Sequence, residues 1–172
     1  KVVDQIAYIE ADSIIVQDLG VLAIVKEEYP NLTIHASTQL AVHNTSGMKI
    51  LENLGVKRAV LSRELTLEEI GRIKETCPEM ELEVFIHGAL CYAYSGLCLA
   101  SGMMLGRSAN RGECGQICRT WFTADIPNTP SGTEDEQIVS RDGYFFSMKD
   151  LSLKTRVTAL EDIGVAAAKV EG

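Results

Sequence analysis

The sequence lacks any run of about 20 apolar residues, the length that a membrane-spanning helix requires. Its first residues, KVVDQIAYIEADS, contain neither the apolar core nor the small-residue cleavage site of a signal peptide. Positive charge is also scarce, because 16 Lys and Arg stand against 24 Asp and Glu, a formal net charge of −8. We therefore expect a cytoplasmic protein that does not bind membranes, and the acidic balance disfavours non-specific binding to nucleic acid.

The short motifs of familiar hydrolases and metal sites are missing as well. The chain contains no H-E-x-x-H, no G-x-S-x-G and no C-x2-C sequence, and its three histidines are not grouped in a ligand motif. Its 46% hydrophobic and 23% charged residues are nevertheless typical of a globular domain. Function must therefore be sought in less common patterns.

A repeated strand-and-helix pattern is the clearest structural signal. Short apolar runs rich in β-branched residues occur at 13–18, 32–38, 56–62 and 82–88, and VAAAKVEG ends the chain. Helical spacing separates them at 19–29, 45–54 and 66–76, and returns at 153–163. Thr66 and Glu69 form a capping-box pattern, and Gly55 stands where a helix end favours glycine. Alternating strands and helices predict an α/β fold with a parallel sheet.

Polar residues follow the predicted strands, as they do at the carboxyl rim of a barrel. We therefore predict a truncated, partial (β/α)8 TIM-type barrel, because a complete one needs about 250 residues. Residues 1–172 would form a fragment of a single barrel domain, with a Cys-rich insertion at 83–122, a polar loop at 123–143 and a final strand and helix unit at 144–172, which includes a sixth strand at YFFSM. Exposed sheet edges of such a fragment would favour a homodimer.

Four of the five cysteines lie close together in the sequence, at Cys91, Cys98, Cys114 and Cys118. Four thiolates suit a [4Fe–4S] cluster, and an all-cysteine zinc site needs the same number. Their spacings of x6, x15 and x3 match no common short motif, so packed cysteines and disulfides stay open as alternatives. Cys77, outside this segment, is expected to be a packed side chain.

The segments EVFIHGALCYAYSGLCLAS and NRGECGQICR resemble the signature of the peptidase U-32 family, the collagenase-like peptidases of unassigned catalytic type. Further similarity runs through IIVQDLG, IHASTQ, SREL, MKDL and KVEG. The resemblance implies one of two activities: hydrolysis of peptides, or oxygen-independent hydroxylation of an RNA base or a small aromatic precursor. For the second, it implies a [4Fe–4S] cluster bound by the four clustered cysteines, so the expected partners are RNA, an aromatic precursor or a peptide.

Four residues at predicted strand ends are candidates for catalysis: His35, Arg63, Glu64 and His87. A guanidinium such as that of Arg63 can bind a carboxylate or phosphate through two hydrogen bonds. His87 and Cys91 follow one strand closely enough to act as base and nucleophile, although no oxyanion hole is identifiable. A third hypothesis is a non-catalytic scaffold stabilised by zinc or disulfides.

Overall fold

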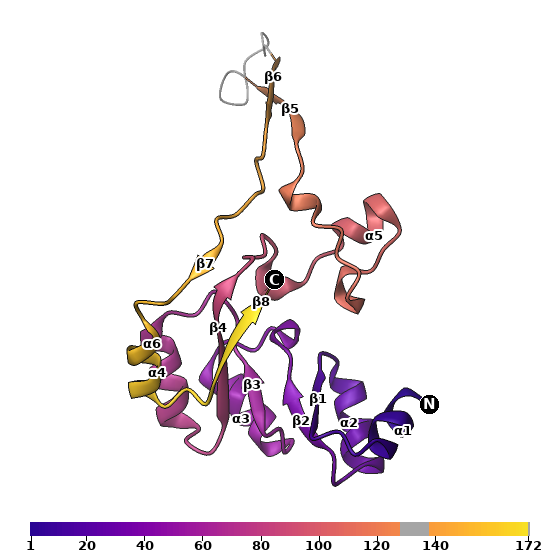
Figure 1. Ribbon diagram of the computed structural model, residues 1–172, viewed down its shortest axis with the longest axis vertical. Coiled ribbons are helices and arrows are strands. Elements are labelled where there is room, and N and C mark those ends of the chain that lie inside the picture. The colour runs from indigo at the N-terminus through magenta and orange to yellow at the C-terminus, as the bar shows by residue number, and fades with distance from the viewer. Residues whose placement is uncertain (128–137, 172) are drawn as a thin grey trace. The chain divides into compact units, whose positions relative to one another are not determined.

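The computed structural model describes residues 1–127 and 138–171 (Figure 1). The chain divides into two compact units. Unit 1 comprises Lys1–Leu97 together with Asp150–Gly172, and unit 2 comprises Cys98–Lys149. Unit 2 therefore lies, along the chain, between two segments of unit 1.

Unit 1 is built on a parallel sheet with the strand order β1-β2-β3-β4-β8, and the short β7 pairs antiparallel with β4. The sheet curls into a half-barrel, so the predicted mixed α/β class and parallel pairing are confirmed. The strands are β1 (Ser13–Val16), β2 (Thr33–Ala36), β3 (Arg58–Val60), β4 (Glu81–Gly88), β7 (Leu151–Ser152) and β8 (Ala167–Glu171). The helices are α1 (Val2–Tyr8), α2 (Leu19–Glu28), α3 (Thr45–Asn53), α4 (Leu67–Thr76) and α6 (Val157–Ile163), with short 3-10 turns η1 (Thr38–Leu40) and η2 (Tyr94–Gly96).

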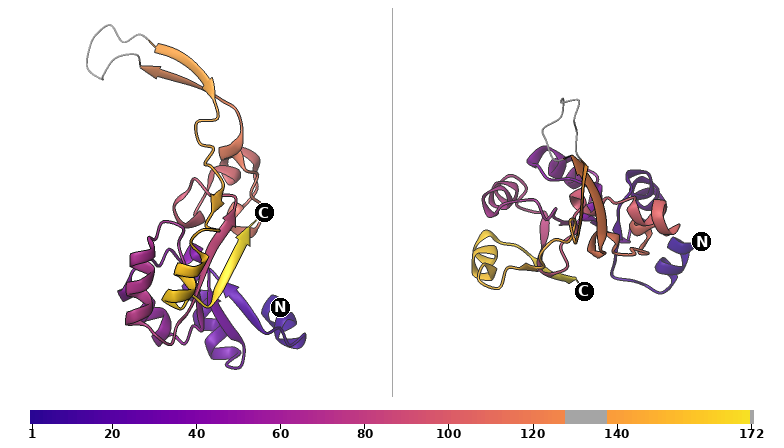
Figure 2. Two further views of the ribbon diagram at one scale, coloured as in Figure 1. Left: turned by 60° about the vertical axis from the view of Figure 1, so that its left-hand side comes forward. Right: turned by 90° about the horizontal axis from the view of Figure 1, so that it is seen from above.

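The helices form an arc along one face of the sheet, as the view from above shows (Figure 2). Side chains alternate along a strand, so every second residue of β2, β3 and β4 faces the helices. This buried layer is the hydrophobic core. It includes Ile34, Ala36, Ala59, Leu61, Leu82 and Val84 from the strands and the segments that follow them, and Leu22, Val25, Met48, Leu51, Ile70, Ile73 and Leu160 from the helices.

The helix ends form where local chemistry specifies them. The Thr66 hydroxyl accepts a hydrogen bond from the backbone of Glu69, and the Glu69 carboxylate accepts one from the backbone of Thr66, which confirms the predicted capping box. Asp18 and Asn44 cap α2 and α3 in the simpler way, each accepting one backbone hydrogen bond. Gly55, which follows α3, has the positive φ of 73° that favours glycine.

Unit 2 contains the helix α5 (Ala100–Leu105), the 3-10 turns η3 (Ala109–Arg111) and η4 (Ile117–Arg119), and a two-stranded antiparallel hairpin of β5 (Phe122–Pro127) and β6 (Ile138–Gly143). The prediction of a polar loop over 123–143 was therefore wrong where these strands pair; the acidic run TEDEQ within it lies outside the described residues. The strand predicted at YFFSM was also wrong, because residues 144–148 form no strand and pairing resumes only at β7. No helix in the described ranges is long and apolar enough to span a membrane.

Candidate functional site

Arg63 lies at the carboxyl edge of the sheet, three residues beyond the end of β3. Its side chain is only 9% exposed and forms an ion pair with Glu171 at the end of β8. The guanidinium stacks on the ring of Phe85, 4.0 Å from the ring centroid. Burial lowers the pKa of Arg63, and the neighbouring Cys91 and Glu64 oppose that shift. Arg63 thus connects β3, β4 and β8 at one point of the edge.

Glu64 fixes the loop that follows β4. Its carboxylate accepts a hydrogen bond from the backbone nitrogen of Ser95 at 2.8 Å and a weaker one from the Ser95 hydroxyl at 3.4 Å. The Ser95 hydroxyl also lies 3.0 Å from that of Ser62, and both serines are buried. Ser95 has a φ of 49°, a left-handed conformation that is unfavourable for a serine and persists only where neighbours hold it. These contacts place Cys91, at the start of this loop, beside the same edge.

A charged network that the sequence interpretation missed lies on the inner face of the sheet, opposite the helices. Glu83 in β4 contacts Arg58 at 3.3 Å and Lys169 at 3.0 Å, and Arg58 also binds Glu81 at 2.7 Å. Lys169 and Glu171, two residues apart in β8, thus have different partners: Lys169 pairs with Glu83, and Glu171 pairs with Arg63. The period-two pattern of ELEVF contains the signal, since it places Glu81, Glu83 and Phe85 on one face.

The two histidine candidates do not share a site. His87 is exposed at the carboxyl end of β4, whereas His35 in β2 is in register with Arg58 and, through it, with Glu81 at the start of β4. Six residues of extended strand separate Glu81 from His87, about 20 Å. The expectation that both histidines lie near one rim was therefore wrong, and a catalytic role for either stays a prediction.

The environment of His35 predicts a pH-dependent stability. Burial, followed by the positive charge of Arg58, lowers the pKa of His35 below its usual value. At a pH between the lowered pKa of His35 in the folded chain and its usual pKa in the unfolded chain, the unfolded chain binds more protons than the folded chain. The free energy of unfolding therefore falls as the pH drops below about 6.5. We expect His35→Gln to weaken this dependence in urea unfolding between about pH 7.5 and 5.5. Equal slopes in the two proteins would contradict the assignment.

The four clustered cysteines are divided between the units. Cys91 belongs to unit 1, and Cys98, Cys114 and Cys118 belong to unit 2. None of the four forms a disulfide with a described residue, and all four lie outside the hydrophobic core, in contrast to the buried Cys77. Within the described ranges, no three His, Cys, Asp or Glu side chains are grouped closely enough to hold a metal ion.

Backbone hydrogen bonds organise the cysteine segment of unit 2. The backbone nitrogen of Gln116 donates to the sulfur of Cys114 at 3.4 Å, and that of Cys98 donates to the side-chain oxygen of Asn110 at 3.3 Å. The hydroxyl of Ser101, which is 1% exposed, accepts from the backbone of Gly115 at 3.0 Å. These hydrogen bonds hold the backbone around Cys98 and Cys114 in place.

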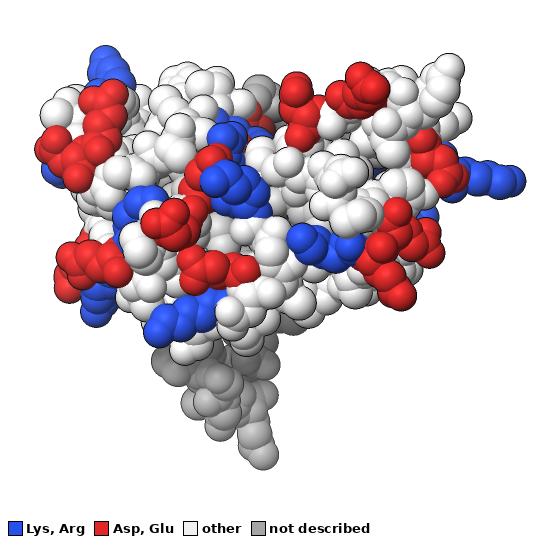
Figure 3. Space-filling view, turned by 90° about the horizontal axis from the view of Figure 1, so that it is seen from below, with Lys and Arg blue, Asp and Glu red and all other residues white. Residues whose placement is uncertain are grey.

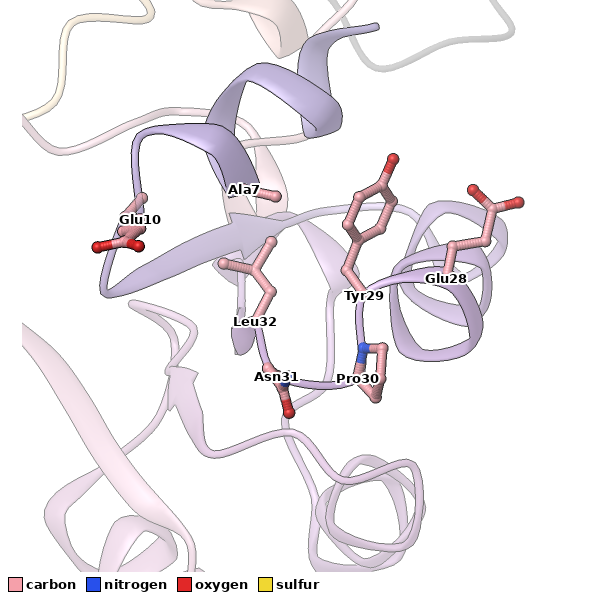
Figure 4. A pocket seen from close by; sticks show the side chains of 8 residues that line it. Ala7, Glu10, Glu28, Tyr29, Pro30, Asn31 and Leu32 are labelled. Carbon is pink, nitrogen blue, oxygen red and sulfur yellow. The ribbon is translucent and has the colours of Figure 1, made fainter.

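Two cavities of unit 1 differ in their suitability for an anionic ligand. One, of about 450 Å³, lies beside Arg63 and has apolar walls from Phe85 and Leu153 together with a second guanidinium, Arg156. The other, of about 510 Å³, lies between α1 and the turn after α2 and carries the carboxylates of Glu10 and Glu28 (Figure 4). Acidic and basic side chains are also interspersed on the face seen from below (Figure 3). The cavity beside Arg63 also holds one carboxylate, that of Glu68, but its two guanidinium groups make it the better match for a negatively charged group.

Sequence comparison identifies the family of this chain. The family model of peptidase family U32 matches residues 1–172. The chain belongs to peptidase family U32, which confirms the resemblance seen in the sequence.

The relatives carry two kinds of name. "tRNA hydroxylation protein P" of Helicobacter pylori strain J99 is 36% identical over 98% of this chain and 40% of its own length. "23S rRNA 5-hydroxycytidine C2501 synthase" of Escherichia coli K12 is 40% identical over 94% of this chain and 23% of its own. "Collagenase" of Porphyromonas gingivalis W83 is 32% identical over 100% of this chain and 42% of its own. This chain therefore spans less than half of each relative, and no solved structure matches it.

Proposed function

We propose that the chain is part of a protein that acts in the hydroxylation of an RNA base, in a tRNA or an rRNA. The observation that carries this proposal is the pair of RNA-hydroxylation names among relatives that are 36% and 40% identical over nearly the whole chain. Identity alone does not separate the two kinds of name, because a relative named as an uncharacterized protease is 39% identical and the one named collagenase is 32% identical. A small aromatic precursor stays a second candidate substrate, and dimerisation through the sheet edges stays a prediction.

We further propose that the half-barrel is part of a (β/α)8 barrel, with a Cys-rich insertion between β4 and β7. Active sites of such barrels form at the carboxyl ends of the strands. In this chain that edge carries Arg63, Glu64 and Cys91, so the substrate base would approach there. Arg63 is already paired with Glu171, and its role in this proposal is to hold the edge together and contribute positive charge near the substrate.

The thiols suit an iron–sulfur cluster in their chemistry. A [4Fe–4S] cluster needs four thiolates, and Cys91, Cys98, Cys114 and Cys118 are four cysteines outside the core that form no disulfide with a described residue. When bound, such a cluster supplies one-electron redox chemistry. The hydrogen bond from the Gln116 backbone nitrogen to the Cys114 sulfur supports ligation, because hydrogen bonds to ligand sulfurs are a feature of iron–sulfur sites that tunes the cluster potential. Zinc bound by the same thiols is the alternative.

Anaerobic purification with iron, sulfide and zinc analysis tests the cofactor. We expect about four iron and four sulfide per chain and visible absorption, and serine at any of the four clustered cysteines should remove most of the iron. Cys77→Ala is the control, because this buried thiol lies outside the cluster segment and its loss should leave the iron content unchanged. One zinc per chain without iron would contradict the cluster and favour a zinc-stabilised scaffold.

The reaction is tested on cellular RNA. In cells that lack the parent gene, nucleoside mass spectrometry should reveal a tRNA or rRNA base that has lost one oxygen atom, and re-expression should restore it. Hydrolysis is the competing function, favoured by the relative named collagenase. Against a Cys91 and His87 dyad, the His87 imidazole makes no hydrogen bond to any described residue. If the purified protein cleaves gelatin, and the RNA of cells that lack the gene is unchanged, the proposal of hydroxylation is wrong and peptidase activity takes its place.

A further inference from the structure

The β5–β6 hairpin of unit 2 has two chemically different faces. Cross-strand partners share a face, so the register pairs Phe122 with Gly143 and Ala124 with Arg141 on one side. We call this the aromatic face, because the rings of Phe145 and Phe146 also cover it. Phe146 packs edge-on against Phe122, with centroids 5.1 Å apart, and Phe145 lies over Gly143, 3.6 Å from where a Cβ would stand.

The opposite face is acidic. It carries Thr123 paired with Asp142 and Asp125 paired with Ser140, each pair joined by a side-chain hydrogen bond of 2.7 or 2.5 Å. A phosphate chain would be repelled there by two carboxylates. On the aromatic face, the only charge among the described residues is the exposed guanidinium of Arg141, which forms no ion pair with a described residue.

Stabilisation of the hairpin does not account for all of these rings. A two-stranded hairpin is marginally stable alone and benefits from cross-strand aromatic pairs. Trp121 and Tyr144 already provide such a pair next to the strands, with centroids 5.2 Å apart. Phe145 and Phe146 add a second set and stay 43% and 39% exposed, so much of their surface is available to a ligand.

We propose that the aromatic face binds unpaired bases of the RNA substrate by stacking, with Arg141 contacting the phosphate backbone. Proteins recognise single-stranded RNA through exposed aromatic rings interleaved with basic side chains. Over the whole of unit 2 the sequence has five Lys or Arg and six Asp or Glu, so the positive charge that this face offers to a phosphate is that of Arg141. This inference rests on the proposed function, because it assigns that RNA a binding surface.

Fluorescence anisotropy with a labelled single-stranded RNA of about 12 nucleotides tests this surface. Phe145→Ala should weaken binding about tenfold, the effect of losing one stacked base. Arg141→Gln should lower the slope of log affinity against log salt by about 0.7, as expected for one lost phosphate contact. Tyr8→Ala removes an exposed aromatic ring from α1, and Lys49→Gln removes an equal charge from α3; both should bind like the unmodified protein.

The outcomes separate this inference from the proposed function. No binding by the unmodified protein, equal loss in Tyr8→Ala, or stronger binding of the same sequence as a duplex would overturn the stacking surface. A change of oligomeric state in Phe145→Ala, with unchanged RNA affinity, would make this face a protein interface instead. If Phe145→Ala keeps normal RNA affinity and hydroxylation persists, the proposed function stands and the stacking surface is refuted. If Phe145→Ala loses RNA affinity, but cells with the unmodified protein show no hydroxylation that depends on it, the surface stands and the proposed function is refuted.

Discussion

Replacing Gly88 by alanine should destabilise unit 1 by about 3 kcal/mol or more. Gly88 has a φ of 116°, a conformation that side chains rarely adopt. A Cβ at this position would also overlap the backbone carbonyl oxygen of Glu171, so β8 would have to move away from the end of β4. That movement would disturb the hydrogen bond from the Ala89 nitrogen to Glu171 and the ion pair between Glu171 and Arg63.

Substitutions at two other glycines, measured by urea unfolding, separate the two causes of the expected destabilisation: backbone strain and overlap of the new Cβ with its neighbours. Gly55 has a φ of 73°, but a Cβ there would meet only the flexible end of Lys26, so Gly55→Ala should reveal the backbone strain alone, about 1 kcal/mol. Gly71 lies inside α4 with open space around it, and Gly71→Ala should stabilise the helix by about 0.5–1 kcal/mol. If Gly88→Ala cost no more than Gly55→Ala, the close approach of β4 and β8 would be refuted.

Glu83→Gln should have the second large effect, a loss of about 3 kcal/mol. The Glu83 side chain is only 11% exposed and lies between Arg58 and Lys169. The substitution keeps the shape of the side chain but removes its charge, which leaves two cations on the inner face with Glu81 as their remaining acidic partner. Breaking a buried pair is costly because the remaining charge is desolvated without compensation.

Urea unfolding at neutral pH measures this loss, with Glu79→Gln as the matched control. Glu79 is exposed and forms no ion pair with a described residue, so the same substitution there should change stability by less than about 0.5 kcal/mol. Adding Lys169→Met to Glu83→Gln should cost less than the sum of the two single changes, because the second removes an already unpaired cation. Strict additivity would show that the two side chains are not coupled.

The sequence was sufficient for the parallel sheet, because each strand there is an apolar run separated from the next by a helix with its own end signals. Thr66, Glu69 and Gly55 specify helix ends through local hydrogen bonds and backbone geometry, which need no tertiary information. The β5–β6 hairpin was missed for the opposite reason. β5 alternates apolar and polar residues but β6, IVSRDG, does not, and the Pro, Gly and acidic residues of the whole segment give it the composition of a loop.

The candidate site was predictable in its location but not in its contacts. Parallel strands end at one edge, so polar residues after them were expected to gather there, and Arg63 and Glu64 do. The ion-pair partner of a charged side chain depends on the register between strands that are distant in sequence. Lys169 in β8 is aligned with Phe85 in β4, and this register brings the Lys169 side chain to Glu83 rather than to Glu171. The cluster ligands and the catalytic roles of His35, Arg63, Glu64 and His87 stay predictions.

The passage of the chain from β4 through unit 2 to β8 has a consequence for folding and evolution. Paired residues in neighbouring strands from β1 to β4 are roughly 20 residues apart in the sequence. Glu83 and Ala167, which pair β4 with β8, are separated by the whole of unit 2. Closing that longer loop costs only about 1 kcal/mol more, because closure entropy grows with the logarithm of length. The segment that carries three of the clustered cysteines can therefore lengthen, shorten or acquire a different hairpin at little thermodynamic expense to the sheet.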